Sequence, residues 1–379
     1  MNHFQISSTV YKFRYLKGVE TDMSQELPQP LNVSIEDHHA FIMECLRHVG
    51  TSEQHALIVA DALVLTDSWG TFTHGSKLLS GYTSRVKHGG CRSDVDPEIV
   101  RDGPSWAIVD GNSTLGQVAA TFAMRTAIGK ARRAGMAYVG VHNSCHFGAA
   151  GVYSAMAADE NMIGISTAND IPSVAAPGSR KAVLGTNPFS YAVPARKHPP
   201  ILLDMAMSTV AGGKVYAAHQ LGKEIPDNWI IDASGRPTTD GSLYPKDAAL
   251  APMSGHKGYG LALLMESLAG VLSGANLTWN VKAWISDSPS EPTHHGAGFL
   301  AFNVGVMQDI NEFLDRVDGL IDEIHGAPKV EGIDRLYVPG EMEWERREIA
   351  KENGITLPPD VVMVLRQMTR EIGLETGIV

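Results

Sequence analysis

The sequence predicts an α/β protein in which helical segments from both ends of the chain flank a central body of strands and helices. From about residue 106, short apolar strands alternate with longer amphipathic helices, whereas the segments before and after this body repeat their apolar residues with helical spacing. The hydrophobic fraction of 44% and the charged fraction of 19% are typical of a globular protein. We therefore expect one helical domain from residues 31–105 and 308–379, and one α/β domain from residues 106–307.

The N-terminal part of this helical domain is expected to hold three helices. Ser34 can cap the first, and Thr51 with Gln54 matches a capping box for the second. A third helix is expected to start at Thr73, because threonine is a good N-cap residue. This start places His74 at a helix N-terminus.

The spacing of apolar residues also predicts the strands and helices in the rest of the chain. The segments expected to form strands are 106–111, 137–141, 162–168, 189–194, 200–206 and 296–304. The segments expected to form helices are 117–135, 149–161 and 257–275, and then 308–326, 343–354 and 359–373 in the C-terminal part. No strand is followed by G-x-G-x-x-G, and neither a GxxxxGK[ST] phosphate loop nor an H-E-x-x-H zinc motif occurs. A Rossmann dinucleotide site, ATP-type chemistry and a zincin site are therefore not predicted.

Composition limits the partners and the compartment. A formal charge of −11 disfavours nucleic acid, and no apolar stretch has the length of a signal peptide or a membrane span. Cys45, Cys91 and Cys145 are scattered and odd in number, so neither a disulfide framework nor a thiolate zinc site is expected, and a reducing cytoplasm fits best. Residues 1–30 are expected to be a disordered extension, with Met23 as an alternative start.

Several segments are richer in polar and small residues than packing requires. They are Thr73-His74-Gly75 and residues 142–153, 184–194, 203–215, 225–240, 255–274 and 337–341. In this order and spacing they resemble the malate/L-lactate/ureidoglycolate dehydrogenase family, a non-Rossmann group that also includes sulfolactate dehydrogenase, diketogulonate reductase and piperideine-2-carboxylate reductase. The resemblance covers roughly residues 31–375.

The resemblance implies a homodimer with a sulfolactate-dehydrogenase-like fold and a mostly antiparallel or mixed central sheet. Residues 106–307 would bind NAD or NADP, and the helical domain would form the substrate side of an active site between the two domains. The positions that match the cofactor contacts of the family are Asp204, Met205, Ala206, Ser208, Lys257, Gly258, Pro339, Gly340 and Glu341. Small residues and a lysine suit a pyrophosphate, and an acidic residue suits a ribose hydroxyl.

His74 and His146 match the two family histidines to which acid–base roles are assigned. Reduction of a ketone develops an alkoxide, so the reaction needs a positioned acid with a pKa near neutrality. A helix N-terminus disfavours imidazolium, which would make a protonated His74 a readier donor. Either histidine can also be read as a purely structural hydrogen-bonding residue. We expect one of them to exchange the proton and the other to orient the substrate, and the sequence does not say which.

The substrate side is less well defined. Thr73, Asn143, Thr186 and Asn187 are candidates for hydrogen bonds to substrate, although Asn187-Pro188 is also ordinary turn chemistry.

One departure concerns the substrate carboxylate. Four residues after the first histidine, well-known members of the family have an arginine, whose fork holds a carboxylate. Here Leu78 occupies that position and Lys77 precedes it. Either Lys77 or another cation replaces the arginine, or the substrate is a less acidic carbonyl compound.

These observations favour an NAD(P)-dependent oxidoreductase that transfers hydride to or from a small 2-oxo or 2-hydroxy acid. The alternatives are reduction of a cyclic imine carboxylate and a non-catalytic dimeric binding protein on the same scaffold. The remaining histidines, including His38-His39 and His294-His295, lack ligand spacing with a third partner, so we expect surface positions and no metal site.

Overall fold

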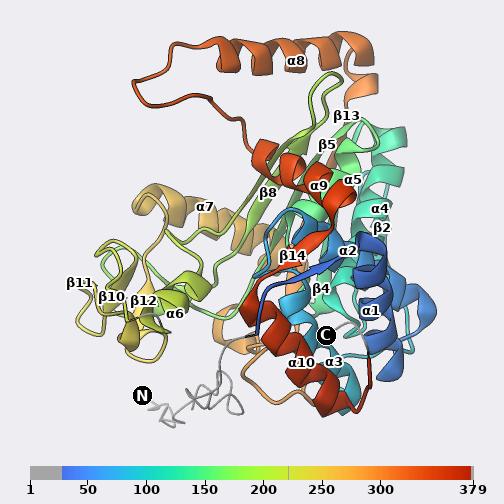
Figure 1. The fold of residues 1–379 in the computed structure, drawn as a ribbon. Helices are drawn as coiled ribbons and strands as arrows, with labels where there is room; N and C mark the ends of the chain where they lie inside the picture. Colours follow the sequence, from blue (N-terminus) through green and yellow to red (C-terminus); the bar gives the residue numbers. More distant parts are fainter. Residues whose placement is uncertain (1–27, 221, 377–379) are drawn as a thin grey trace, which may run out of the picture.

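The computed structural model describes residues 28–220 and 222–376. Its centre is a seven-stranded mixed sheet with the order β2-β3-β4-β13-β5-β8-β9 (Figure 1). The strands are β2 (Glu98–Gly103), β3 (Trp106–Asp110), β4 (Met136–Ser144), β5 (Met162–Ala168), β8 (Phe189–Val193), β9 (Ile201–Met205) and β13 (His295–Asn303). Neighbours pair antiparallel except β3 and β4, which confirms the mostly antiparallel sheet. The predicted N-terminal extension up to residue 27 and the start at Met23 lie outside the described residues.

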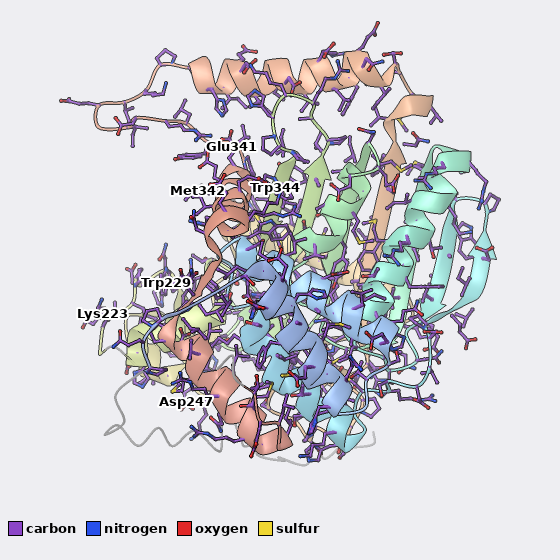
Figure 2. The ribbon with its side chains drawn as sticks, turned by 45° about the vertical axis from the view of Figure 1, so that its right-hand side comes forward. Lys223, Trp229, Asp247, Glu341, Met342 and Trp344 are labelled. Atoms are coloured by element: carbon purple, nitrogen blue, oxygen red, sulfur yellow. The ribbon has the colours of Figure 1, made fainter. Side chains whose placement is uncertain are left out.

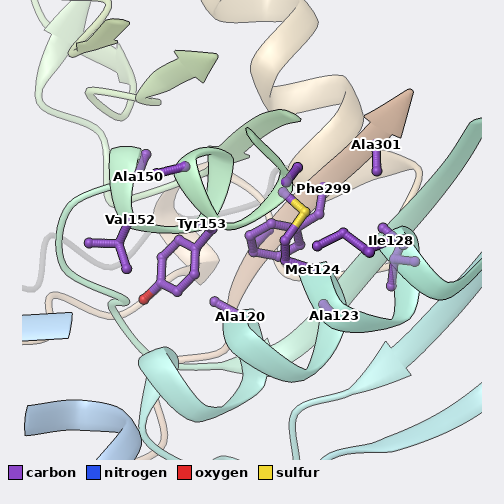
Figure 3. Packing of buried hydrophobic residues seen from close by; sticks show 14 of the residues in the cluster. Ala120, Ala123, Met124, Ile128, Ala150, Val152, Tyr153, Phe299 and Ala301 are labelled. Carbon is purple, nitrogen blue, oxygen red and sulfur yellow. The ribbon is translucent and has the colours of Figure 1, made fainter. Parts of the chain in front are cut away.

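Helices cover both faces of this sheet. On one face lie α4 (Gly116–Ala134) and α5 (Gly151–Ala158), whose alanines allow a close approach to the strands. In Figure 3, Ala120, Ala123 and Met124 of α4 lie in the same packed cluster as Tyr153 and Phe299, and all five are buried. The other face is covered by the end of α7 (His256–Glu266) and the π-helical segment Ser267–Val271 that continues it.

The two ends of the chain pack together. Helices α1 (Ile35–His48), α2 (Glu53–Ser68), α3 (Leu79–His88) and α10 (Pro359–Ile372) share one hydrophobic core. The antiparallel pair β1 (Leu31–Val33) and β14 (Ile355–Leu357) joins the two ends directly.

The predicted helix starts are correct in one case and displaced in two. Ser34 caps α1, because its Oγ accepts a hydrogen bond from the Asp37 amide at 2.9 Å. The cap of α2 is Ser52 rather than Thr51, since the Ser52 hydroxyl accepts from the His55 amide. The third helical stretch begins with a 3-10 turn at Ser76 and not at Thr73.

A second sheet forms a small lobe with α6 (Gly212–Gln220). Its strand order is β11-β10-β12-β6-β7, and its strands are β6 (Val174–Ala175), β7 (Ala182–Leu184), β10 (Ile230–Asp232), β11 (Pro237–Thr238) and β12 (Ala248–Leu250). The sequence did not predict these strands, because two or three residues are too few to show alternation.

Two C-terminal helices pack against different parts of the molecule. Helix α8 (Ile310–Gly326) packs on the end of the β8–β9 hairpin and lies far from α1, α3 and α10 in Figure 1. Helix α9 (Glu341–Asn353) contacts α2. The domain boundaries at residues 105 and 308 stay a prediction. Both β2 and α8 come from the residues predicted for the helical domain, yet β2 belongs to the central sheet and α8 packs on a hairpin of that sheet. Among the described residues, no helix combines the length and the apolarity needed to cross a membrane.

Candidate active site

Two adjoining cavities lie where the helical unit, the large sheet and the small lobe meet. The sheet-side cavity, of about 480 Å³, lies against β9 and the start of α5. The lobe-side cavity, of about 500 Å³, lies between the small sheet and the segment around Trp284. Both are lined by His74, His146, Asp170 and Thr186, so these residues stand at the junction. The structure thus brings together the two histidines that the sequence singles out.

The turn that carries His74 is held by a carboxylate from α2. Asp67 Oδ2 accepts a hydrogen bond from the Ser76 amide at 3.0 Å and lies 2.9 Å from Nε2 of His38. A Cβ on Gly75 would lie 1.8 Å from Asp67 Oδ1, so only glycine fits there. His38 is fully buried, contrary to the expected surface position, because it pairs with Asp67.

His74 itself precedes the helix rather than opening it. Gly75 is the N-cap of the 3-10 turn, and the adjacent amide is already satisfied by Asp67. Burial lowers the pKa of His74, and the charge of Asp170 partly opposes this effect. The direction of the shift agrees with the sequence argument, but its cause is burial and not a helix terminus. The Thr73 hydroxyl lies 3.0 Å from Nδ1 of His74.

His146 follows β4 in a turn that fixes the protonation of its ring. Its Nδ1 lies 2.9 Å from the Tyr82 hydroxyl and accepts a hydrogen bond from the Gly148 amide at 3.3 Å. Burial raises the pKa of Tyr82 well above its usual range, so this hydroxyl keeps its proton and can donate it. Two donors on Nδ1 leave Nε2 as the protonated nitrogen.

The surroundings of His146 keep its ring neutral. The ring stacks on Trp284, with centroids 4.3 Å apart and an interplanar angle of 12°. Burial and then the neighbouring His74 lower the pKa of His146 to about 3. The centroids of the two histidine rings are 6.0 Å apart. The junction therefore offers two neutral imidazoles to whatever binds between them.

Asp170 and His295 form a second pair beside these histidines, and sequence reasoning missed both. Asp170 Oδ1 lies 3.1 Å from Nε2 of His295. His295 is only 3% exposed, whereas a surface position was expected from the sequence. Burial alone would raise the pKa of Asp170, but the hydrogen bond with His295 and the electrostatic influence of His295 and His146 hold it below its usual value. Asp170 is a carboxylate two residues after the end of the largely buried strand β5, and this position was the available signal.

Most candidate residues from the large sheet and the turn before α9 line the sheet-side cavity. They are Asp204, Met205, Ala206, Pro339 and Gly340, together with Thr73 and Thr186 from the substrate set.

Close backbone contacts form this wall of the cavity. The Leu202 amide donates to the Pro339 carbonyl at 2.9 Å, and a Cβ on Gly340 would lie 2.7 Å from Cβ of Leu202. Gly340 also has a φ of 93°, so a glycine is required there.

Asp204 joins β9 to the start of α5 at this wall. Its Oδ2 accepts a hydrogen bond from the Gly151 amide at 2.7 Å. Partial desolvation in the cavity wall raises the pKa of Asp204 to about 6, although the residue is exposed to the cavity and the backbone amides of Gly151 and Ala150 oppose the rise. Glu343 and Lys214 line the same cavity and were not predicted.

Other candidates lie outside the lining of both cavities. Lys77 points to α10, where its Nζ lies 2.7 Å from Asp360, whereas Leu78 lines the lobe-side cavity. Asn143 donates to Asp110 at 2.9 Å, and Asn187 donates to Glu266 at 2.8 Å. Asn143 thus binds the end of β3, and Asn187 binds the end of α7.

Four residues that were predicted to contact the cofactor also lie outside the lining of both cavities. Ser208 donates to the Val210 carbonyl at 2.8 Å, and Lys257 is exposed near the start of α7. A Cβ on Gly258 would lie 1.9 Å from the Met253 carbonyl oxygen, which explains this glycine by packing. Glu341 is buried, and its Oε2 accepts from the Val338 amide at 2.9 Å.

The lobe-side cavity holds cations that the sequence argument did not identify. Arg180 and Lys181 line it from the segment between β6 and β7, and Lys246 lines it from the segment before β12. They come from the small lobe, whose strands are too short to be predicted, and therefore no pattern pointed to them.

Comparison with known proteins agrees with this geometry. Residues 33–366 match the family model for malate/L-lactate dehydrogenase. The chain is 37% identical to a malate dehydrogenase of Pyrococcus abyssi over 89% of its own length and 93% of that protein. It is 30% identical to a Δ1-pyrroline-2-carboxylate/Δ1-piperideine-2-carboxylate reductase of Pseudomonas putida, over 85% of this chain and 92% of that one.

The fold agrees as well. The crystal structure of malate dehydrogenase from Entamoeba histolytica superimposes with a TM-score of 0.86 at 32% identity, covering 92% of this chain and all of that one. The chain belongs to the malate/L-lactate dehydrogenase family and is an oxidoreductase of the nicotinamide-dependent, 2-hydroxy-acid type.

Proposed function

We propose that the enzyme moves hydride between a nicotinamide cofactor and C2 of a small 2-oxo or 2-hydroxy acid, with His74 as the proton-exchanging group. One observation carries this proposal: two neutral imidazoles stand 6.0 Å apart at the junction of two cavities of similar size. The sheet-side cavity would hold the cofactor and the lobe-side cavity the substrate.

The sheet-side cavity has the chemistry of a dinucleotide site. Close backbone approach at Gly340, the cation of Lys214 and the carboxylate of Asp204 suit a pyrophosphate and ribose hydroxyls. When bound, the cofactor supplies or accepts the hydride at its nicotinamide ring. Because Asp204 and Glu343 both line this cavity, negative charge would disfavour a 2′-phosphate, and we propose that NAD(H) is preferred to NADP(H).

The two histidines would have different roles. His146 presents Nε2–H as a neutral donor, which can hold the substrate oxygen in either direction of the reaction. His74 lacks the two converging donors of His146, and its lowered pKa keeps it neutral and able to take the hydroxyl proton when a 2-hydroxy acid is oxidised. The imidazolium so formed is stabilised by Asp170, whose negative charge raises the pKa of His74.

The substrate carboxylate needs a cation, and Leu78 cannot provide one. Lys77 is paired with Asp360, so we assign this task to Arg180 and Lys181, which line the lobe-side cavity. An arginine fork binds a carboxylate through two parallel hydrogen bonds, which favours Arg180 as the main contact.

A second candidate function is reduction of a cyclic imine carboxylate. Leu78, Trp279 and Trp284 give the lobe-side cavity apolar walls, and these suit a ring better than a short polar acid.

We also propose a cytoplasmic homodimer. Helix α7 and its continuation expose Leu261, Leu263, Leu264, Val271 and Leu272, each by more than 40%. Such a row of large apolar side chains marks a protein interface, and a second copy of the chain is the partner we assign to it. The three cysteines are buried free thiols, which fits a reducing compartment.

A substrate panel tests the proposed reaction. Purified protein is assayed with 2-oxo acids and with cyclic imine carboxylates, each with NADH and with NADPH, by following the nicotinamide absorbance. We expect turnover of 2-oxo acids, preferably with NADH, and a loss of about 10²-fold or more in His74→Gln. Turnover of imines alone would favour the second candidate. If calorimetry shows that neither nicotinamide binds, the enzyme proposal fails.

A further inference from the structure

A cluster of two histidines and a carboxylate lies away from the cavities, at the end of the β8–β9 hairpin. His198 comes from the loop between the two strands, and Asp322 and His325 lie one turn apart on α8. A ring nitrogen from each histidine and a carboxylate oxygen of Asp322 all lie within 4.8 Å of one another. The two imidazoles meet edge to face with centroids 5.6 Å apart.

Each histidine of this cluster already has a ring nitrogen close to a carboxylate oxygen, and a bound cation could contact both atoms. His198 Nε2 lies 2.8 Å from Oδ1 of Asp322. His325 Nε2 lies 2.8 Å from Oε1 of Glu341, but it is buried and its approach lacks hydrogen-bond geometry. The Glu341 side chain is only 8% exposed. In Figure 2, the labelled Glu341 lies at the end of α9 that faces α8.

We propose that His198, Asp322 and His325 bind a divalent transition metal of the Zn²⁺ type, with Glu341 as a fourth ligand or as the carboxylate that orients His325. Ligands bound to Zn²⁺ at about 2.0–2.2 Å in a tetrahedron stand roughly 3.3 Å apart. Contacts of 2.8 Å between nitrogen and oxygen therefore need only a small outward movement to admit the ion. Imidazole and carboxylate together favour Zn²⁺ and its neighbours over Mg²⁺ or Ca²⁺.

Two cations beside the cluster have to be accommodated, Lys197 and Arg335, and Nη2 of Arg335 lies 3.3 Å from Oε1 of Glu341. Lys197 Nζ lies 2.9 and 2.8 Å from the two oxygens of Asp322. A carboxylate has about four acceptor sites, so Asp322 can bind the metal while it still accepts from the lysine. Because the Lys197 side chain is 63% exposed, it can also swing into solvent when the ion enters.

The position of the cluster suggests what the metal would do. It would join the hairpin to α8 and, through Glu341, to the turn whose Pro339 and Gly340 line the sheet-side cavity. Glu341 also accepts from the Val338 amide, so its position fixes the chain entering that turn. The metal would therefore stiffen a wall of the cavity from outside, without touching the reacting groups.

Direct binding measurements test this proposal. Tag-free full-length protein is stripped with a chelator and titrated with Zn²⁺, with Co²⁺ and with Mg²⁺. We expect one Zn²⁺ or Co²⁺ per chain, a raised Tm and the strong visible bands of four-coordinate Co²⁺, with no such response to Mg²⁺. No stoichiometric Zn²⁺ binding to the wild-type chain would overturn the proposal.

Matched variants locate the site. His198→Gln and His325→Gln should abolish the Co²⁺ bands, and Glu341→Gln should weaken binding roughly ten- to a hundredfold. His219→Gln, which alters an exposed histidine on α6, is the control and should bind as the wild type does. Equal binding by the control and both cluster variants would place the metal elsewhere and disprove the assignment. Circular dichroism of each variant without metal confirms that it is folded.

Discussion

The protonation of His146 depends on two neighbours that reach the same ring nitrogen. Tyr82 and the Gly148 amide both approach Nδ1, which leaves Nε2–H for the substrate. A ring held by only one of them could exchange its tautomer, and then it would present an acceptor where the substrate oxygen needs a donor.

Replacing Tyr82 by Phe should therefore lower kcat while the protein stays folded. Loss of one hydrogen bond worth about 1.4 kcal/mol in the transition state predicts a decrease in kcat/KM of about tenfold. Tyr138→Phe is the control, because this half-buried tyrosine donates to the Leu268 carbonyl on the other face of the sheet. Steady-state kinetics of both variants decide the point, and equal activities would show that Tyr82 does not orient His146.

The charge of Asp170 sets the pH range in which His74 works. Oxidation of a 2-hydroxy acid needs neutral His74, so kcat/KM falls as the pH drops through the pKa of this residue, which lies below the ordinary 6.5. Asp170 raises this pKa, and Asp170→Asn should therefore move the acid limb of the profile to lower pH. The plateau should also fall, because the imidazolium loses its counter-charge. A limb that moves to higher pH, or does not move, would contradict the assignment of His74 as the base.

Arg180 is the residue on which substrate choice should depend. In Arg180→Gln we expect KM for a 2-oxo acid to rise by about tenfold or more, since a charge-assisted pair contributes roughly 1.5–3 kcal/mol. Lys77→Gln is the matched control, because Lys77 is bound to Asp360 outside the cavities. If KM rises only in Lys77→Gln, the carboxylate is held on the α3 side after all.

At the scale of elements, the turn before α3 is positioned by α1 and α2. Both helices are joined by two histidine–carboxylate pairs, one buried (His38–Asp67) and one exposed (His39–Asp61). The buried pair also caps the turn that carries His74.

These two pairs provide a controlled comparison of stability. Asp67→Asn should lower the free energy of unfolding by about 3–5 kcal/mol, because it leaves buried groups uncompensated. Asp61→Asn should cost about 1 kcal/mol or less, as is usual for an exposed pair. Denaturant unfolding measures both, and kcat should fall only in the Asp67 variant. Similar losses of stability in the two variants would show that burial of the pair has no special role.

The same elements show what the sequence could and could not predict. Long periodic segments were identified almost to the residue, as for β5 and α4, because their apolar spacing is repeated several times. The small lobe was missed because its strands have two or three residues. The cap of α2 was displaced by one residue because Thr51 and Ser52 have the same capping chemistry.

Within the site, motif matching identified side chains but not their directions. His74 and His146 meet at the junction of the cavities, whereas Lys77 and Asn143 turn toward other partners. Asp170 and His295 are separated by more than a hundred residues and pair only after folding. His198 and His325 belong to the same class, so spacing along the chain could not reveal them either.

At the scale of the whole molecule, α7 carries an apolar surface that would be exposed to water if the protein were a monomer. The helix lies beside the small lobe in Figure 1 and contacts its strand β7. Leu261, Leu263 and Leu264 of α7 are exposed. Burial of apolar area at about 25 cal/mol per Å² is enough to favour association when a second copy covers the same face by two-fold symmetry.

Leu264→Glu should therefore convert the predicted dimer into a monomer, because Leu264 is 49% exposed on α7 and a charge there would be buried at the interface. Leu320→Glu is the matched control, since Leu320 is 51% exposed on α8 and lies on another part of the molecule. Light scattering coupled to gel filtration gives the mass of each variant. A dimeric Leu264→Glu variant, or a wild-type chain that elutes as a monomer, would show that α7 is not the dimer interface.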